Sequence, residues 1–161
     1  MTSTSKGYAL PRWLRPMNRL VVTMQRAGLR TGPVHTLTVR GRKSGKDRTT
    51  PVTPFEFEGG RYIVGGFPGA DWVANARAAG VGVFASGRRS QRVRLVELSA
   101  EESRPVLAVF PAKVPRGVPL IRQARVVQDG TPEEFVALAG RVAVFRIEPA
   151  EGPGSERSSS R

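Results

Sequence analysis

The sequence contains no cysteine and a single histidine, His35, in 161 residues. Without cysteine, disulfides, zinc–thiolate sites and thiol nucleophiles are all excluded. One imidazole cannot build a histidine-based metal cluster, so we expect no metal site. A Ser–His–Asp triad would need His35, and no nucleophile-elbow motif supports one. If the chain is an enzyme, a bound organic cofactor must therefore supply the reactive chemistry.

Long apolar runs and acidic residues are also scarce. No run approaches the roughly 20 apolar residues of a membrane span, and the N-terminus lacks the apolar core of a signal peptide, so we expect a cytoplasmic protein. Acidic residues number 13 against 26 Lys and Arg, which gives a net charge of +13. This excess indicates an anionic partner. We expect no nucleic acid, because the basic residues are not interleaved with aromatic residues and no nucleic-acid-binding motif is present.

The pattern of apolar residues predicts one domain, mainly β with helices (α+β), over residues 7–149, between disordered polar tails at 1–6 and 150–161. Strands are predicted at 34–40, 48–57, 61–67, 81–86, 90–98 and 142–148. Helices are predicted at 17–29, at 71–79 between an Asp71 N-cap and Gly80, and after the capping boxes at 99–102 and 131–134. The Pro-, Gly- and Arg-rich residues 111–130 are predicted to form a long loop beside a site.

The predicted N-terminal helix is basic and amphipathic. Such a helix either packs on the domain or touches a membrane surface. Packing is favoured, because Pro11 and Pro16 break the pattern upstream of it. Peripheral membrane association through this helix stays open.

The most informative stretch is 37–52, Leu-Thr-Val-Arg-Gly-Arg-Lys-Ser-Gly-Lys-Asp-Arg-Thr-Thr-Pro-Val. Its cationic residues crowd around two glycines between two predicted strands: Arg40, Arg42, Lys43, Lys46 and Arg48. Such a turn offers backbone N–H groups, a serine hydroxyl and cations to one phosphate or carboxylate, without a metal. The alternative is a solvated hairpin loop whose charges keep a sheet edge soluble. Charge and glycine content alone leave both readings open.

The predicted helix at 71–79 follows a glycine-rich segment, Gly65-Gly66-Phe67-Pro68-Gly69. A helix N-terminus behind glycines is a second potential anion site. An ordinary capped connector with Trp72 as a core anchor is the more frequent arrangement, and the helix alone favours it.

Taken together, these motifs resemble the deazaflavin-dependent nitroreductase family, which are actinobacterial split-β-barrel oxidoreductases that bind coenzyme F420. The first motif is 37–52. The second, Asp-Trp-Val-Ala-Asn-Ala-Arg-Ala-Ala-Gly (71–80), is similar to the family's Trp-x-x-Asn-x-Arg-Ala helix, and the third is the closing Val-Phe-Arg-Ile-Glu-Pro (144–149). The three motifs occur in the family's order and span most of residues 17–149.

The resemblance implies a split β-barrel and a set of cofactor-binding residues. The loop residues that would hold the phosphate and the acidic glutamyl tail of F420 are Arg42, Lys43, Ser44 and Gly45. The residues that would line the deazaflavin ring, largely with backbone groups, are Arg48, Thr49, Thr50, Pro51 and Val52. Trp72 and Asn75 would close the cofactor's other side. Tyr8, Trp13 and Phe67 are the candidates for substrate contact.

The implied activity is hydride transfer from reduced deazaflavin to a small or lipophilic acceptor, such as a quinone, a nitroaromatic compound or an enone. Catalysis would be mostly proximity and orientation, so no catalytic side chain is assigned. An FMN-binding split-barrel oxidoreductase and a non-catalytic cofactor- or lipid-binding protein are the alternatives. Phe67-Pro68 departs from the family, whose members often carry a polar or basic residue there. The oligomeric state is not fixed by the sequence.

Overall fold

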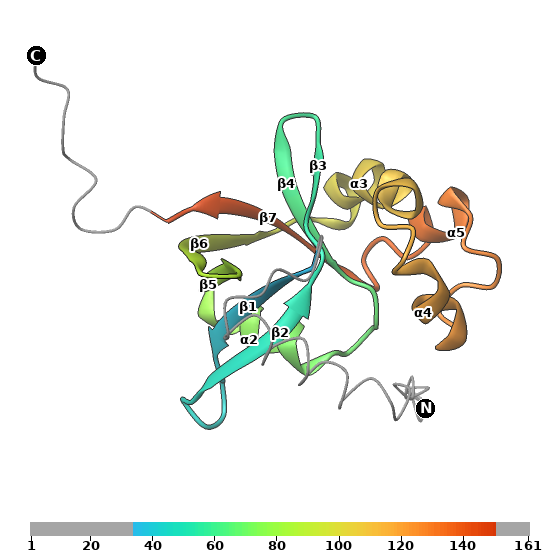
Figure 1. The fold of residues 1–161 in the computed structure, drawn as a ribbon. Helices are drawn as coiled ribbons and strands as arrows, with labels where there is room; N and C mark the ends of the chain where they lie inside the picture. Colours follow the sequence, from blue (N-terminus) through green and yellow to red (C-terminus); the bar gives the residue numbers. More distant parts are fainter. Residues whose placement is uncertain (1–33, 151–161) are drawn as a thin grey trace, which may run out of the picture.

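The computed structural model describes residues 34–150 (Figure 1). The predicted helix at 17–29, the tail at 1–6, Tyr8, Trp13 and residues 151–161 lie outside the described residues. No helix within 34–150 is long and apolar enough to cross a membrane.

Within residues 34–150, seven strands form one curled antiparallel sheet, a half-barrel (Figure 1). The strands are β1 (His35–Arg40), β2 (Asp47–Val52), β3 (Phe55–Phe57), β4 (Gly60–Gly65), β5 (Val81–Ser86), β6 (Arg89–Glu97) and β7 (Ala143–Pro149). Their order in the sheet is β2-β1-β5-β6-β7-β4-β3. The predicted class, mainly β with helices, is therefore confirmed.

Four helices complete the described fold: α2 (Asp71–Ala79), α3 (Ala100–Lys113), α4 (Val118–Gln123) and α5 (Pro132–Val136). Helix α2 packs against β1, β5 and β6 and adds Val73 and Ala76 to the core inside the barrel. The other three gather on one side of the sheet, around a second core that contains Phe110 and Phe135 (Figure 1).

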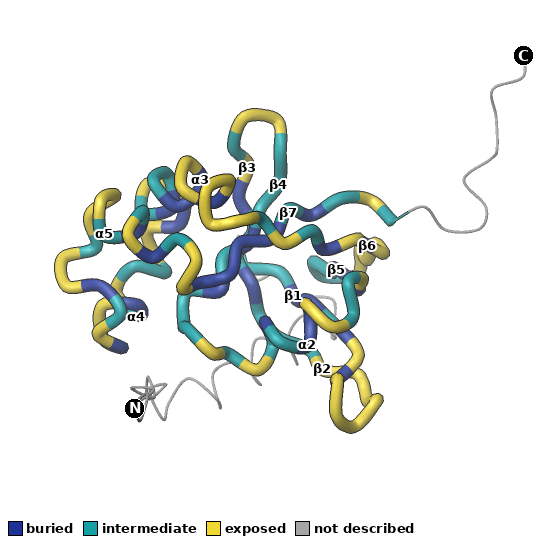
Figure 2. The backbone as a smooth tube through the Cα atoms, turned by 180° about the vertical axis from the view of Figure 1, so that it is seen from behind, coloured by how far each residue is buried: buried dark blue, intermediate teal, exposed yellow. Residues whose placement is uncertain are grey.

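Strand alternation decides which side chains fill the barrel. Leu37 and Val39 on β1 are buried, and Leu37 lies opposite the buried Phe84 on β5. The intervening positions on β5 point away, so Val81 and Val83 remain exposed. Figure 2 shows the result: buried residues lie at the centre of the molecule, and the tips of the hairpins consist of exposed residues. The tip that joins β1 to β2, residues 41–46, is called the basic loop below.

Three sequence predictions need correction. The single strand predicted at 48–57 is broken into β2 and β3, because Pro54 lacks a ladder N–H and the chain crosses there from one sheet edge to the other. The loop predicted at 111–130 contains the end of α3 and all of α4. Pro119 misled the prediction, because it lies in the first turn of α4, where its missing N–H costs nothing. Asp71 is the first helical residue and Ala70 the N-cap.

Glu134, in the confirmed second capping box, organises the turn before α5. Its Oε1 accepts backbone N–H bonds from Asp129, Gly130 and Thr131, and its Oε2 accepts one from Gln128 at 2.6 Å. These backbone donors lower the pKa of Glu134 below its ordinary value. The carboxylate therefore stabilises the fold above the pKa of the unfolded chain, and this contribution is lost as the pH falls toward the lowered folded pKa.

We expect Glu134→Gln to lower the melting temperature at neutral pH, because a neutral amide offers one acceptor oxygen where the carboxylate offers two. The difference from the wild type should shrink as the pH falls from about 7 to about 3, through the window in which Glu134 itself is protonated. Thermal unfolding at several pH values measures it, with the exposed neighbour Glu133→Gln as a matched control. A difference that stays constant down to pH 3 contradicts this role.

Candidate functional site: the basic loop and the start of helix α2

The loop between β1 and β2 is closed by its own backbone. The Gly41 N–H donates to the Lys46 carbonyl at 2.8 Å, and the Gly45 N–H donates to the Gly41 carbonyl at 3.0 Å. The Ser44 hydroxyl oxygen accepts from the Lys46 N–H at 3.2 Å. Gly45 has a φ of 68°, a left-handed conformation that favours glycine. Ser44 and Gly45 therefore shape the loop.

Arg42 connects this loop to α2. Its guanidinium Nη1 donates to Asn75 Oδ1 at 2.7 Å, and its backbone N–H donates to the same oxygen at 3.2 Å. The guanidinium also reaches the Asp71 carbonyl at 3.3 Å and the Asp71 carboxylate at 3.3 Å. The structure thus brings together Arg42 and Asn75, which the sequence predicted in one site from positions 33 residues apart. The role it shows for Arg42 is to hold the loop against the helix.

The remaining cations of the basic loop, and those of the two strand ends beside it, are open to solvent. Arg40, Lys43, Lys46 and Arg48 are all exposed, and within residues 34–150 none of them forms an ion pair with an acidic side chain. Like charges held this close repel one another, and a bound anion would relieve that repulsion. The donors fit a phosphate or carboxylate ligand better than a neutral one.

Strand β2 continues from the loop as an edge of the sheet. Among the described strands it pairs only with β1, so no ladder within residues 34–150 uses the backbone N–H and C=O groups on its other side. The side chain of Val52 fills the barrel core, and the Thr49 hydroxyl lies 2.8 Å from that of Thr38. Thr50 and Pro51 are half-buried. What this segment can present to a ligand is therefore mainly backbone, as expected for residues that line a ring.

Trp72 packs against the barrel. Its ring centroid lies 6.1 Å from that of the buried Phe145. This agrees with Trp72 as a core anchor, and its contact with a cofactor stays a prediction. Gly65 on β4 makes the close packing possible, since a Cβ at this position would lie 2.6 Å from Val73 Cγ2 and 3.3 Å from Trp72 Cζ2.

We expect Gly65→Ala to push α2 away from β4 and to cost about 1–3 kcal/mol of stability, the usual range for overpacking a core. Because α2 carries Asn75, cofactor affinity should fall as well. Chemical denaturation and equilibrium binding of F420 measure the two effects. Unchanged values for both would contradict the packing described here.

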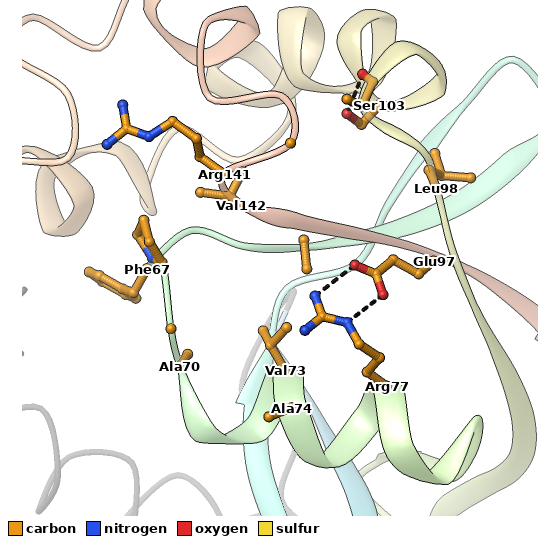
Figure 3. A pocket seen from close by; sticks show the side chains of 15 residues that line it. Phe67, Ala70, Val73, Ala74, Arg77, Glu97, Leu98, Ser103, Arg141 and Val142 are labelled. Atoms are coloured by element: carbon orange, nitrogen blue, oxygen red, sulfur yellow. Dashed lines mark hydrogen bonds and ion pairs between the residues drawn. The ribbon is translucent and has the colours of Figure 1, made fainter. Parts of the chain in front are cut away.

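A cavity of about 360 Å³ lies on another side of α2 (Figure 3). Phe67, Val73 and Val142 are among its lining residues. Arg77 closes one side with two hydrogen bonds of 2.7 Å to Glu97, and these bonds hold the pKa of Glu97 below its ordinary value. None of residues 41–52 lines this cavity. The structure therefore separates Phe67, a predicted substrate residue, from the basic loop. Sequence reasoning missed the Arg77–Glu97 pair, because nothing in a single sequence links α2 to β6.

Comparisons with known proteins show which family and which fold this chain is similar to. The family model described as F420H2-dependent quinone reductase matches residues 15–114, more than half of the chain. A solved structure described as a domain-swapped dimer is 22% identical, with a TM-score of 0.52 over 84% of this chain and 97% of that one. A structure of an F420H2-dependent reductase, FDR-A, is also 22% identical, with a TM-score of 0.49 over 73% and 95% of the two chains. No curated protein gave a significant match.

The first of these structures supports the fold, and the family model supports the chemistry. The curled sheet is the predicted split β-barrel, and the basic loop, β2 and α2 all fall inside the matched range. The chain belongs to the F420H2-dependent quinone reductase family and is therefore an oxidoreductase that uses coenzyme F420.

Proposed function

We propose that this protein reduces quinones with F420H2, and that it binds the cofactor along the basic loop, strand β2 and the start of α2. The observation that carries the proposal is the bond between Arg42 and Asn75, because it holds a cationic loop beside an exposed strand edge and a helix N-terminus. These are the recognition elements that an anionic cofactor with a planar ring requires.

The donor set fits the chemistry of F420. The cofactor carries a phosphodiester and a glutamyl tail, and Lys43 and Lys46 supply positive charges without acidic partners in the described structure. Arg48 is the second residue of β2, the strand edge along which we place the deazaflavin ring. Thr49, Thr50 and Pro51 would then meet the ring with backbone groups, and Asn75 would fix the loop at the other side.

The protein's contribution to the reaction is binding and orientation. When bound, F420H2 supplies a hydride, and the balanced reaction converts F420H2 and a quinone into F420 and a hydroquinone. The only histidine lies at the start of β1, at the opposite end of that strand from the loop. Holding the two reactants face to face therefore accounts for the rate enhancement in this proposal.

The proposal also names the class of compound that accepts the hydride. A quinone is favoured over a nitroaromatic compound or an enone by the description of the matching family. Phe67 is half-buried and lines the cavity on another side of α2, so an acceptor held against the ring along β2 would not contact it inside that cavity. A lipophilic quinone would also suit the membrane association considered for the basic N-terminal segment, which lies outside the described residues.

Oxidation of F420H2 under anaerobic conditions tests the proposal, with a quinone, a nitroaromatic compound and an enone offered in turn. We expect the quinone to be reduced fastest. Titration with F420 and with FMN under the same conditions should show tighter binding of F420. Tight FMN binding would favour the flavin alternative, and tight F420 binding without reduction of any acceptor would favour a non-catalytic carrier.

A further inference from the structure

The end of the barrel at which β1 begins, away from the basic loop, holds a second concentration of positive charge. A cavity of about 1000 Å³ lies there, lined by His35, Arg61, Phe84, Ser86, Arg88, Arg89, Ser90 and Gln91. Strand β1 begins at this end and enters the basic loop at the other. Six residues of strand place the two ends about 17 Å apart, so the cavity is distinct from the loop.

Arg61 lines this cavity and is held there by two aromatic neighbours. Its guanidinium carbon lies 4.8 Å from the centroid of the Phe84 ring, a cation–π contact. Its Nη2 lies 3.4 Å from His35 Nε2, and the His35 ring stacks on Phe84 at 4.8 Å between centroids. Glu56 lies opposite Arg61 on β3, yet no ion pair joins them among the described residues. The guanidinium turns toward the barrel end instead.

Two further arginines come from a different element. Arg88 lies in the turn between β5 and β6, and Arg89 begins β6. Both are exposed, and neither forms an ion pair within the described part of the chain. Ser86, Ser90 and Gln91 add neutral hydrogen-bond donors, and no acidic residue lines the cavity.

We propose that the barrel end bounded by Arg61, Arg88 and Arg89 is a second anion-binding site, for a compact ligand with at least two phosphate or carboxylate groups. The three guanidiniums repel one another, and a single anionic group would leave most of this repulsion in place. Two or three anionic groups spaced across the cavity would instead pair with guanidiniums from both β4 and the β5–β6 turn. Because Arg61 is already held by Phe84 and His35, it loses little freedom on binding.

Calorimetric titration with pyrophosphate and with citrate tests the site, on wild-type protein saturated with F420 so that the basic loop is occupied. We expect one equivalent of at least one of the two anions to bind, and the stronger one identifies phosphate or carboxylate as the preferred group. Arg61→Gln and Arg89→Gln should each weaken binding about tenfold or more, since each removes a charged donor. Arg89 is exposed at the start of β6, so its variant should fold even if Arg61→Gln does not.

The matched control is Arg92→Gln, which removes the same charge from β6. Arg92 does not line the cavity and lies opposite the exposed Val83. The variant should bind the anion with an affinity within about twofold of the wild type. Equal losses in Arg92→Gln and Arg89→Gln would overturn the proposal, as would the absence of binding by both anions or displacement of the anion by F420. If F420 itself fails to bind, the same titrations on a Lys43→Ala Lys46→Ala background still decide the question.

Discussion

Asn75→Ala is expected to weaken F420 binding by roughly ten- to hundredfold while the chain still folds. Asn75 is 8% exposed, and its Oδ1 accepts both the backbone N–H and the guanidinium of Arg42. Without that oxygen, the backbone N–H of Arg42 loses its partner and the guanidinium keeps only its two 3.3 Å bonds to Asp71, so the contact between the loop and α2 is weakened. The loop then has to be ordered by the cofactor, which reduces the free energy of binding. Isothermal titration with F420 measures the loss.

Asn75→Asp tests the charge near the loop without changing the position of the loop. An aspartate keeps the acceptor oxygen and the size of the side chain, so Arg42 should stay docked and thermal stability should remain close to that of the wild type. It also places a negative charge beside the proposed anion site, so F420 affinity should still fall. If Asn75→Asp binds F420 as tightly as the wild type does, acidic groups of the cofactor do not lie near α2.

The double variant Lys43→Ala Lys46→Ala is expected to lower F420 affinity by at least about a hundredfold, because hydrogen bonds to charged groups contribute roughly 1.5–3 kcal/mol each. Neither lysine contacts an acidic side chain in the described structure, so stability should change little. The loss should shrink with added salt, since the screening length falls from about 10 Å at 0.1 M to about 3 Å at 1 M. Titrations at both salt concentrations measure it.

A variant with the same net charge provides the control for this experiment. Arg104 on α3 and Arg116 after it are exposed and lie outside the proposed site. Arg104→Ala Arg116→Ala should leave F420 affinity within a few-fold of the wild type. If both double variants lose affinity equally, the effect comes from the overall charge and the loop is a solvated hairpin tip.

Much of the barrel could be predicted from local pattern. Alternation around Leu37 and Val39 identified β1, and Gly80 marked the end of α2, because both signals act within a few residues. The break at Pro54 and helix α4 were missed for the opposite reason. Pro54 lies where the chain leaves one sheet edge for the other, and α4 is a short helix that begins Val-Pro, so its existence depends on packing of Ile121 into the second core.

For the site, the sequence identified the right segments but not their contacts. Motif resemblance placed Arg42 and Asn75 together, and the structure agrees. It assigned Arg42 to the ligand, and that contact stays a prediction. The structure adds that the Arg42 guanidinium bonds to Asn75 and Asp71 of α2, a contact between distant segments that a basic run in the sequence does not indicate.

The last described strand lies in the interior of the sheet. Strand β7 pairs with β6 on one side and with β4 on the other, so it joins two blocks of strands that share no other ladder. During synthesis, the six other strands emerge first. They form two separate blocks, β2-β1-β5-β6 and β4-β3, and these blocks cannot join into one sheet until residues 143–149 have left the ribosome. Until then, β6 and β4 both expose open edges, which are templates for pairing between nascent chains. Chaperone protection of this protein should therefore matter most in the short interval before its final strand is released.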